Sequence, residues 1–232
     1  MRRLEALSEQ FGVSKLTLME KAGKAAAEFI ASKRDLSNHT VIIFCGPGNN
    51  GGDGFVASRY LSKNAMVFVL FFGNEESLPP EAAANLTRIQ ANPRIAILRK
   101  NDLTPQTMQK LQKEFRKEKL ILVDSLLGTG VEGKIREPLS SAITFFNSLN
   151  GYKVSIDIPS GIHPDTGEAA NVSAIPNDII TFHDLKPCLK GRKHVVVAQI
   201  GIPTKAVAEL KKENLKQCAI TFKKRTGKPV CS

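Results

Sequence analysis

A strand, a glycine-rich turn and a helix are predicted in immediate succession over residues 41–61, and this stretch constrains the fold more than any other. Residues 41–45 (Val-Ile-Ile-Phe-Cys) form an unbroken apolar run of strand length, and apolar residues follow Gly54 at helical spacing. Between them, Gly46, Gly48 and Gly51 match the pattern G-x-G-x-x-G. In that arrangement backbone N–H groups and a helix N-terminus approach a phosphate. The turn is not a P-loop, because no Gly-Lys-Ser/Thr closes it.

The same turn carries three short polar side chains, Asn49, Asn50 and Asp53, which a loop that binds only pyrophosphate does not need. Such side chains ligate a cation or hold a polar substrate. The alternative is that they cap the helix and stabilise the turn. That alternative explains a single Asn or Asp well, but it explains the whole string of residues 46–54 poorly.

Segments typical of strands and helices alternate along the rest of the chain. Strands are predicted at residues 66–72, 95–98, 120–123, 153–156, 178–182 and 194–197, with a last one at 218–222. Helices are predicted at residues 4–33 (one or two, with Ser14 as an N-cap), from 79–81 to about 90, at 104–115 behind the cap Thr104, and at 138–149. We therefore expect an α/β fold of three αβα layers, a Rossmann-like, mostly parallel sheet with helices on both faces.

Composition places the chain among ordinary globular proteins. The 232 residues show no linker, repeat or low-complexity tract, so we expect one domain over 1–232, ending in a basic tail at about 223–232. No apolar run reaches transmembrane length and no signal region precedes the first helix, which predicts a soluble, cytoplasmic protein without membrane contact. The four cysteines are too widely spaced for a zinc site or a disulfide framework.

The net charge of +11 favours anionic partners such as nucleotides and phosphates. Its densest runs, at residues 113–119 and 223–225, lack interleaved aromatic residues. A solvated helix face or tail therefore explains them better than a nucleic-acid surface does.

Two aspartates each follow a predicted buried strand, Asp124 after residues 120–123 and Asp157 after 153–156. Carboxylates in such positions need partners, because burying a charge without one is costly. The carboxyl ends of parallel strands lie at one edge of the sheet, where ligands gather. Asp124, with the side-chain oxygens of Asn50 and Ser160, would form an oxygen-only site with one negative charge, which suits a monovalent cation better than Ca²⁺ or a soft metal.

Other residues near these strand ends are candidates with simpler alternatives. Lys134 and Arg136 follow the glycines of residues 128–133 and place positive charge where nucleotide phosphates would lie, although Arg136 is as well explained by a surface ion pair. Glu75 and Glu76 follow the strand of residues 66–72, where a dinucleotide fold has its ribose-binding acid, but surface loops carry glutamates without that role.

Four segments, in order, carry a resemblance to a known family. They are Leu-Met-Glu-Lys-Ala-Gly at 18–23, Gly-Pro-Gly-Asn-Asn-Gly-Gly-Asp-Gly at 46–54, Val-Asp-Ser-Leu-Leu-Gly-Thr-Gly at 123–130 with Arg-Glu-Pro at 136–138, and Ser-Ile-Asp-Ile-Pro-Ser-Gly at 155–161. In these the chain resembles the NAD(P)H-hydrate epimerases, the YjeF N-terminal domain family. The resemblance thins after Gly167, where His183-Asp184-Leu185, Cys188 and Gln199 depart from the family pattern.

The resemblance implies a site and its partners. It implies one K⁺ per subunit on Asn50, Asp124 and Ser160, a homodimer, and a separate NAD(P)H-hydrate dehydratase in the same pathway. It implies hydrated NADH or NADPH as substrate, bound by Asn49, Asn50, Gly51, Gly52, Asp53, Gly128, Thr129, Gly130, Val131, Glu132, Gly133, Lys134 and Asp157.

The reaction implied is interconversion of the R and S hydrates, and our hypothesis is that Asp157 acts in it first as general acid and then as base. A non-catalytic scaffold of the same fold, with a protein or RNA partner, is the alternative. Such a scaffold would be free to lose Asn50, Asp53, Asp124 and Asp157, and all four are present. A nucleotide-dependent oxidoreductase is disfavoured, because polar side chains stand where pyrophosphate needs bare backbone.

Overall fold

The computed structural model describes residues 2–130 and 133–226, with the backbone alone given for residue 2 and for 216–226. Contacts divide the chain into two units, a larger one of Met19–Ile200 and a smaller one that joins Met1–Leu18 to Gly201–Ser232. The helices are α1 (Arg2–Gln10), α2 (Lys15–Lys33), α3 (Asn49–Leu61), α4 (Pro80–Gln90), α5 (Pro105–Glu114), α6 (Leu139–Ser148) and α7 (Thr204–Thr226), with short 3₁₀ turns at Leu36–Asn38, Glu75–Ser77, Phe115–Lys117 and Pro187–Leu189.

The larger unit is built on a seven-stranded sheet in the order β3-β2-β1-β4-β5-β6-β7, in which every neighbouring pair is parallel. The strands are β1 (Thr40–Cys45), β2 (Met66–Phe71), β3 (Ile95–Arg99), β4 (Leu120–Ser125), β5 (Tyr152–Ile156), β6 (Asp178–Phe182) and β7 (Val195–Ala198). The strand order reverses between β1 and β4. In open parallel sheets, that reversal opens the crevice where ligands bind.

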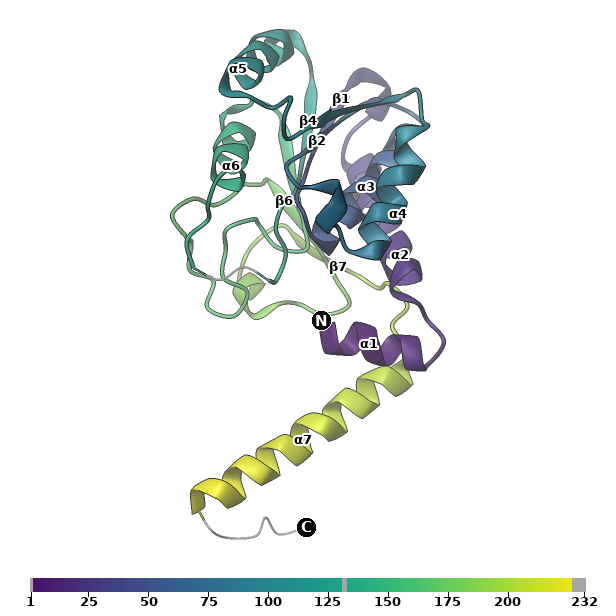
Figure 1. Ribbon diagram of the computed structural model, residues 1–232, viewed down its shortest axis with the longest axis vertical. Helices are drawn as coiled ribbons and strands as arrows, with labels where there is room; N and C mark the ends of the chain where they lie inside the picture. Colours follow the sequence, from purple (N-terminus) through teal and green to yellow (C-terminus); the bar gives the residue numbers. More distant parts are fainter. Residues whose placement is uncertain (1, 131–132, 227–232) are drawn as a thin grey trace. The chain divides into compact units, whose positions relative to one another are not determined.

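Helices cover both faces of this sheet, α5 and α6 on one and α3 and α4 on the other (Figure 1). Under α5 and α6, Ile42 and Phe44 of β1 pack with Phe146 in one buried cluster. On the other face, the ring of Phe55 meets that of Phe71 edge-on, with centroids 5.5 Å apart. The expected α/β architecture is confirmed, and alternating apolar side chains of the strands supply both cores.

The smaller unit has its own apolar contacts. Leu4 and Leu7 of α1 pack against Ala206 at the start of α7. Arg3 Nε also donates to Glu213 Oε2 at 2.9 Å. Among the described residues, no helix is both long and apolar enough to cross a membrane.

One predicted strand and two predicted boundaries were wrong. The strand predicted at 218–222 is part of the helix α7, because the Lys, Glu and Leu residues ahead of it continue a helix and a short apolar run alone does not identify a strand. Helix α3 begins at Asn49 instead of after Gly54, and β4 continues through Ser125, so Asp124 lies inside the strand. Of the predicted basic tail, residues 223–226 are helical and 227–232 lie outside the described residues.

The predicted caps were correct. Ser14 Oγ accepts a hydrogen bond from Thr17 N at 3.1 Å, and Thr104 Oγ1 accepts one from Thr107 N at 3.2 Å. Each side chain thereby satisfies one N–H group that the first turn of a helix leaves free.

Candidate functional site

The glycines after β1 allow backbone segments to approach closely at the switch point. A Cβ atom on Gly46 would lie 1.7 Å from Leu126 O, and one on Gly51 would lie 2.1 Å from Gly46 O. Both positions therefore require glycine. This close approach places the first turn of α3, with Gly48 as N-cap, directly beside the segment that follows β4.

Asn50 faces that segment. Its Nδ2 donates to Leu127 O at 3.0 Å, which fixes the orientation of the amide. Its Oδ1 is buried and has no hydrogen-bond partner among the described residues. Since buried polar atoms are nearly always paired, this oxygen is a candidate atom to bind a ligand.

Asp124 is fully buried and accepts four hydrogen bonds, from Leu126 N (3.3 Å), Ser155 Oγ (2.7 Å), Ser160 N (2.9 Å) and Ser160 Oγ (2.5 Å). Burial raises the pKa of Asp124 above its ordinary value, and the hydrogen bonds from Ser160 and Ser155 oppose that rise. The carboxylate thereby joins the ends of β4 and β5 to the turn that contains Ser160.

Ser160 connects Asp124 to Asn50. Besides donating to Asp124, its Oγ accepts a hydrogen bond from Leu127 N at 2.9 Å. Leu127 in turn accepts the amide hydrogen of Asn50. The structure therefore brings Asn50, Asp124 and Ser160 together in one oxygen-rich cluster, as predicted.

Asp157 lies beside this cluster, at the carboxyl end of β5. Its backbone is left-handed, with φ 69°, and its side chain is 14% exposed. A Cβ on Gly128 would lie 3.4 Å from both Asp157 Oδ2 and Asn50 Cβ, so Gly128 stands between the two side chains. The Oδ2 oxygen thus faces the glycine-rich loop.

The second carboxylate oxygen of Asp157 is paired with Lys186, which was not among the predicted site residues. Lys186 Nζ lies 2.8 Å from Asp157 Oδ1 and also donates to Phe182 O at 2.8 Å. Thr181 Oγ1 donates to the same Oδ1 at 3.3 Å. A signal was available, because Lys186 follows β6, and strands that are consecutive in the chain, as β5 and β6 are, usually lie side by side in a sheet, as they do here.

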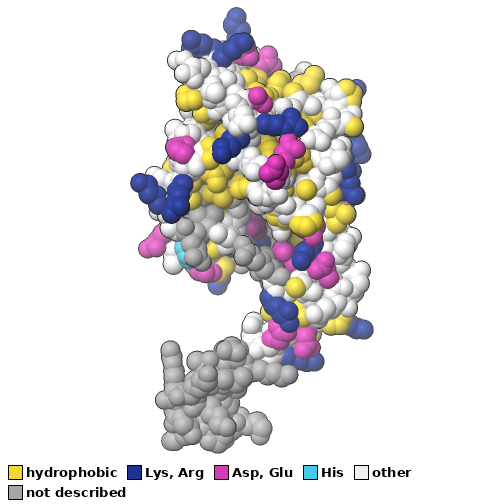
Figure 2. All heavy atoms as spheres, in the orientation of Figure 1, with side chains coloured by type: hydrophobic (Ala, Val, Ile, Leu, Met, Phe, Trp, Pro, Cys, Tyr) yellow, Lys and Arg dark blue, Asp and Glu magenta, His cyan; other side chains and the backbone are white. Residues whose placement is uncertain are grey.

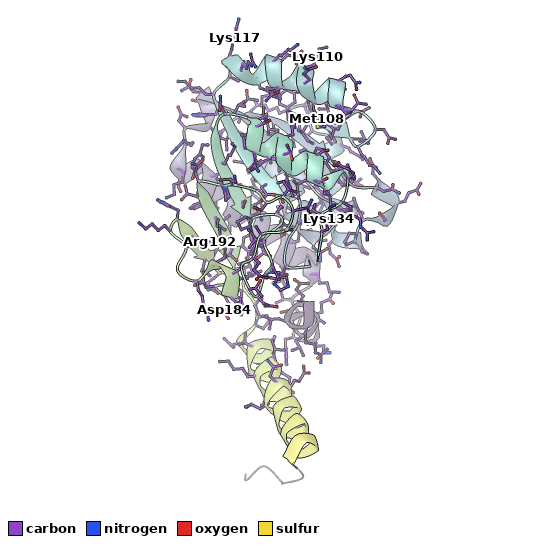
Figure 3. All side chains as sticks on the ribbon, turned by 90° about the vertical axis from the view of Figure 1, so that its left-hand side faces the viewer. Met108, Lys110, Lys117, Lys134, Asp184 and Arg192 are labelled. Carbon is purple, nitrogen blue, oxygen red and sulfur yellow. The ribbon has the colours of Figure 1, made fainter. Side chains whose placement is uncertain are left out.

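The other predicted substrate-binding residues are more open. Asn49 is exposed and Gly51 and Gly52 are buried in the first turn of α3, and Asp53, which follows that turn, is half-buried. Thr129 is half-buried; Gly130, Gly133 and Lys134 are exposed (Lys134 is labelled in Figure 3). Val131 and Glu132 lie outside the described residues.

Two further candidates are used differently or lie on the surface. Glu75 Oε1 accepts from Arg99 Nε, so its carboxylate has a protein partner. Arg136 is exposed. Figure 2 shows Lys and Arg side chains spread over the visible face with Asp and Glu between them, as expected of solvated surface charge.

The chemistry of the cluster limits what it binds. Among the described residues, no group of three or more His, Cys, Asp or Glu side chains is placed to hold a metal ion, so a zinc or tight Ca²⁺ cage is not built from them. Amide, hydroxyl and carbonyl oxygens around a single carboxylate form a hard site of low charge.

A parallel α/β sheet with a polar cluster at its switch point defines a Rossmann-like ligand-binding domain. The family model described as YjeF-related protein N-terminus matches residues 15–188. The chain belongs to this family.

Curated relatives agree with this assignment. The chain is 35% identical to the NAD(P)H-hydrate epimerase of Nitrosopumilus maritimus over 89% of its own length and 94% of the relative. It is also 35% identical, over the same shares, to the NAD(P)H-hydrate epimerase of Cenarchaeum symbiosum. It is 38% identical to a bifunctional NAD(P)H-hydrate repair enzyme of Methanothermobacter thermautotrophicus, matching 86% of this chain and 38% of that enzyme.

A solved structure has the same fold. The crystal structure of the yeast protein YNL200c superposes with a TM-score of 0.72, covers 86% of this chain and 85% of the yeast chain, and is 22% identical in sequence. At that identity the likeness concerns the fold alone.

Proposed function

We propose that this chain is an NAD(P)H-hydrate epimerase, an isomerase that interconverts the R and S forms of hydrated NADH and NADPH in nicotinamide nucleotide repair. Family membership and near full-length similarity to two curated epimerases support it. The observation that carries it is geometric. The Asn50 side chain, whose Oδ1 has no partner in the described parts of the chain, meets the glycine-rich loop and the Asp157 carboxylate at the switch point of the sheet.

Asp157 performs the proton transfers in this proposal. In the hydrate, a hydroxyl group is bonded to C6 of the nicotinamide ring. Asp157 gives a proton to that hydroxyl, the C6–O bond breaks, and the lone pair of the ring nitrogen forms a C=N⁺ bond as water leaves. Water then adds to C6 from either face and returns its proton to Asp157, which regenerates the acid.

The remaining residues hold the substrate. Asn49 to Asp53 at the N-terminus of α3 supply N–H groups and polar side chains to phosphate or ring substituents. Gly128 leaves room between Asn50 and Asp157 for the ring to approach the carboxylate. The loop of residues 129–134, which ends at exposed Lys134, supplies positive charge for a phosphate.

The oxygens of the cluster fit K⁺. Asn50 Oδ1 has no partner among the described residues, and the Asn50 side chain is connected to Ser160 and Asp124 by hydrogen bonds through Leu127, so Asn50, Ser160 and Asp124 would hold the ion. When bound, K⁺ supplies a fixed positive charge that orders the loop and attracts the substrate phosphates.

Two partners belong to the proposal. One is a dehydratase that consumes one hydrate epimer, which the similarity to a bifunctional NAD(P)H-hydrate repair enzyme supports. The other is a second copy of the chain in a homodimer, whose mass by light scattering would be twice that of the 25.3 kDa chain.

The activity is tested with a mixture of R and S NADH hydrates, prepared in acid, and a dehydratase specific for the S form. The dehydratase alone removes the S form quickly and then slows to the rate of spontaneous epimerisation. Addition of this protein is expected to make consumption of the whole mixture fast. Consumption that still slows after the S form is gone would refute the proposed function.

Asp157→Asn tests the assigned role of the carboxyl group. Asparagine adopts φ 69° as readily as aspartate, so the backbone is preserved. Loss of the proton donor is expected to lower kcat by about a hundredfold to ten thousandfold. A folded variant that epimerises at the normal rate would remove Asp157 from the mechanism.

A further inference from the structure

Lys186 is buried although it comes from an exposed loop. Asp184, labelled in Figure 3, and Leu185 are exposed, whereas the side chain of Lys186 is 8% exposed. Lysine normally keeps its ammonium in water, and burying that charge is costly unless a partner compensates for it. The partners of the Lys186 ammonium must therefore compensate for the cost of burying it, and they hold the loop in this conformation.

The partners of Lys186 are specific. Its Nζ contacts Asp157 Oδ1 at 2.8 Å and Phe182 O at 2.8 Å, which fixes the ammonium between a carboxylate and a backbone carbonyl. Thr181 adds a hydrogen bond to the same Oδ1. All of the described donors to this carboxylate therefore lie on its Oδ1 side, and Oδ2 faces Gly128.

We propose that Lys186 is a positioning residue for Asp157, an inference that rests on the function proposed above. Lys186 and Thr181 hold Oδ1 and so prevent rotation of the carboxyl group. Oδ2 is left as the single oxygen that exchanges a proton with the C6 hydroxyl. The ammonium also balances the charge that this poorly hydrated carboxyl group carries after it has given its proton to the hydroxyl.

Positioning predicts a particular kinetic effect. Lys186→Met keeps the length of the side chain and removes the ammonium, so Asp157 is free to rotate. The expected result is a loss of about a hundredfold in kcat, since a displacement of about 1 Å at the reacting group has that effect. KM stays nearly unchanged, because Lys186 does not contact the substrate.

A matched control exists on the same sheet. Lys153 is half-buried and its Nζ donates to the carbonyl of Asn147 at 2.9 Å, and no carboxylate of the described residues pairs with it. Lys153→Met removes a comparable ammonium away from the site. It is expected to leave kcat unchanged, and melting temperatures of both variants report any general loss of stability.

A double-mutant cycle separates positioning from an independent role. In an Asp157→Asn background, Lys186→Met has nothing left to position and is expected to cause no further loss of kcat. This double variant also removes both charges together, so it folds even where Lys186→Met alone leaves a buried carboxylate unpaired.

Chemical rescue supplies a readout that a merely structural residue would not change. In Lys186→Ala, added propylammonium is expected to refill the vacated space and raise kcat with saturation, whereas propanol has no effect. Additive losses in the cycle, or an undiminished kcat in Lys186→Met, would overturn the inference while wild-type activity stands. Failure of the wild-type protein to epimerise the hydrates would instead refute the proposed function, and the inference with it.

Discussion

At the scale of single residues, the site depends on which oxygen atoms are already occupied. Asp124 accepts four hydrogen bonds and thereby joins β4 and β5 to the turn that contains Ser160. Asn50 Oδ1, in contrast, accepts none from the described residues. Asp157 is intermediate, with Oδ1 paired and Oδ2 facing the glycine-rich loop. Asn50 Oδ1 and Asp157 Oδ2 are therefore the atoms proposed to meet the ion and the substrate, while Asp124 supports the strand ends and supplies the charge of the proposed cation site.

Asn50→Ala tests the proposed cation site through stability. A ligand that binds only the folded state stabilises it, by about 2.7 kcal/mol at a hundred times Kd. The melting temperature of the wild-type protein is therefore expected to rise with KCl relative to choline chloride at equal ionic strength, and Asn50→Ala abolishes that difference.

Asn49→Ala is the matched control for this measurement. Asn49 precedes Asn50 in the chain and its side chain is exposed, so its removal leaves the K⁺-dependent rise intact. An equal K⁺ effect in wild type and Asn50→Ala would contradict the assignment of Asn50 as a ligand.

At the scale of elements, the site is assembled by close packing of the segments that leave β1 and β4. The contact between Gly46 and Leu126 brings α3 to the loop that contains Gly128. Gly23 likewise allows α2 to lie close to α3, because a Cβ at this position would be only 2.4 Å from Val56 Cβ. Small residues at these crossings allow the helices to approach, and no local pattern in the sequence reveals such contacts.

Gly46→Ala tests the importance of this contact. Its Cβ would overlap a backbone oxygen that has no flexible side chain to move away, so unfolding free energy is expected to fall by about 3 kcal/mol or more. Gly48→Ala is the control, since nothing lies within 4 Å of its Cβ position and loss of a glycine N-cap costs about 1 kcal/mol or less. Guanidinium denaturation of both variants gives the comparison, and equal midpoints would refute the close approach.

At the scale of the whole molecule, the described residues form two units with separate apolar cores. The larger unit contains the sheet and every described residue of the proposed site. The smaller unit joins the two ends of the chain through Leu4, Leu7 and Ala206. Local opening therefore need not involve both units together.

Leu7→Ala tests this independence. Leu7 is 1% exposed, and truncation of such a leucine costs about 2–5 kcal/mol. Hydrogen exchange is expected to become faster in α1 and in the first turns of α7, with little change in β1 and β4. A uniform increase in exchange across β1 and β4 would show instead that the two units unfold as one.

Patterns within a few residues were enough to predict the strands of the sheet, the parallel α/β class and the caps Ser14 and Thr104. Strand periodicity and capping are governed by near neighbours, so the sequence expresses them directly. The motifs of residues 46–54, 123–130 and 155–161 also identified Asn50, Asp124, Asp157 and Ser160 as a candidate group.

Contacts between distant segments were decided by the tertiary structure alone. The pairing of Lys186 with Asp157 and the acceptor on Asn50 that no described residue satisfies depend on which segments meet and on what each atom binds there. The sequence determines by itself where strands, turns and polar side chains stand along the chain. Burial and hydrogen-bond saturation arise only when the sheet is assembled, and they determine which of those side chains remain free to act.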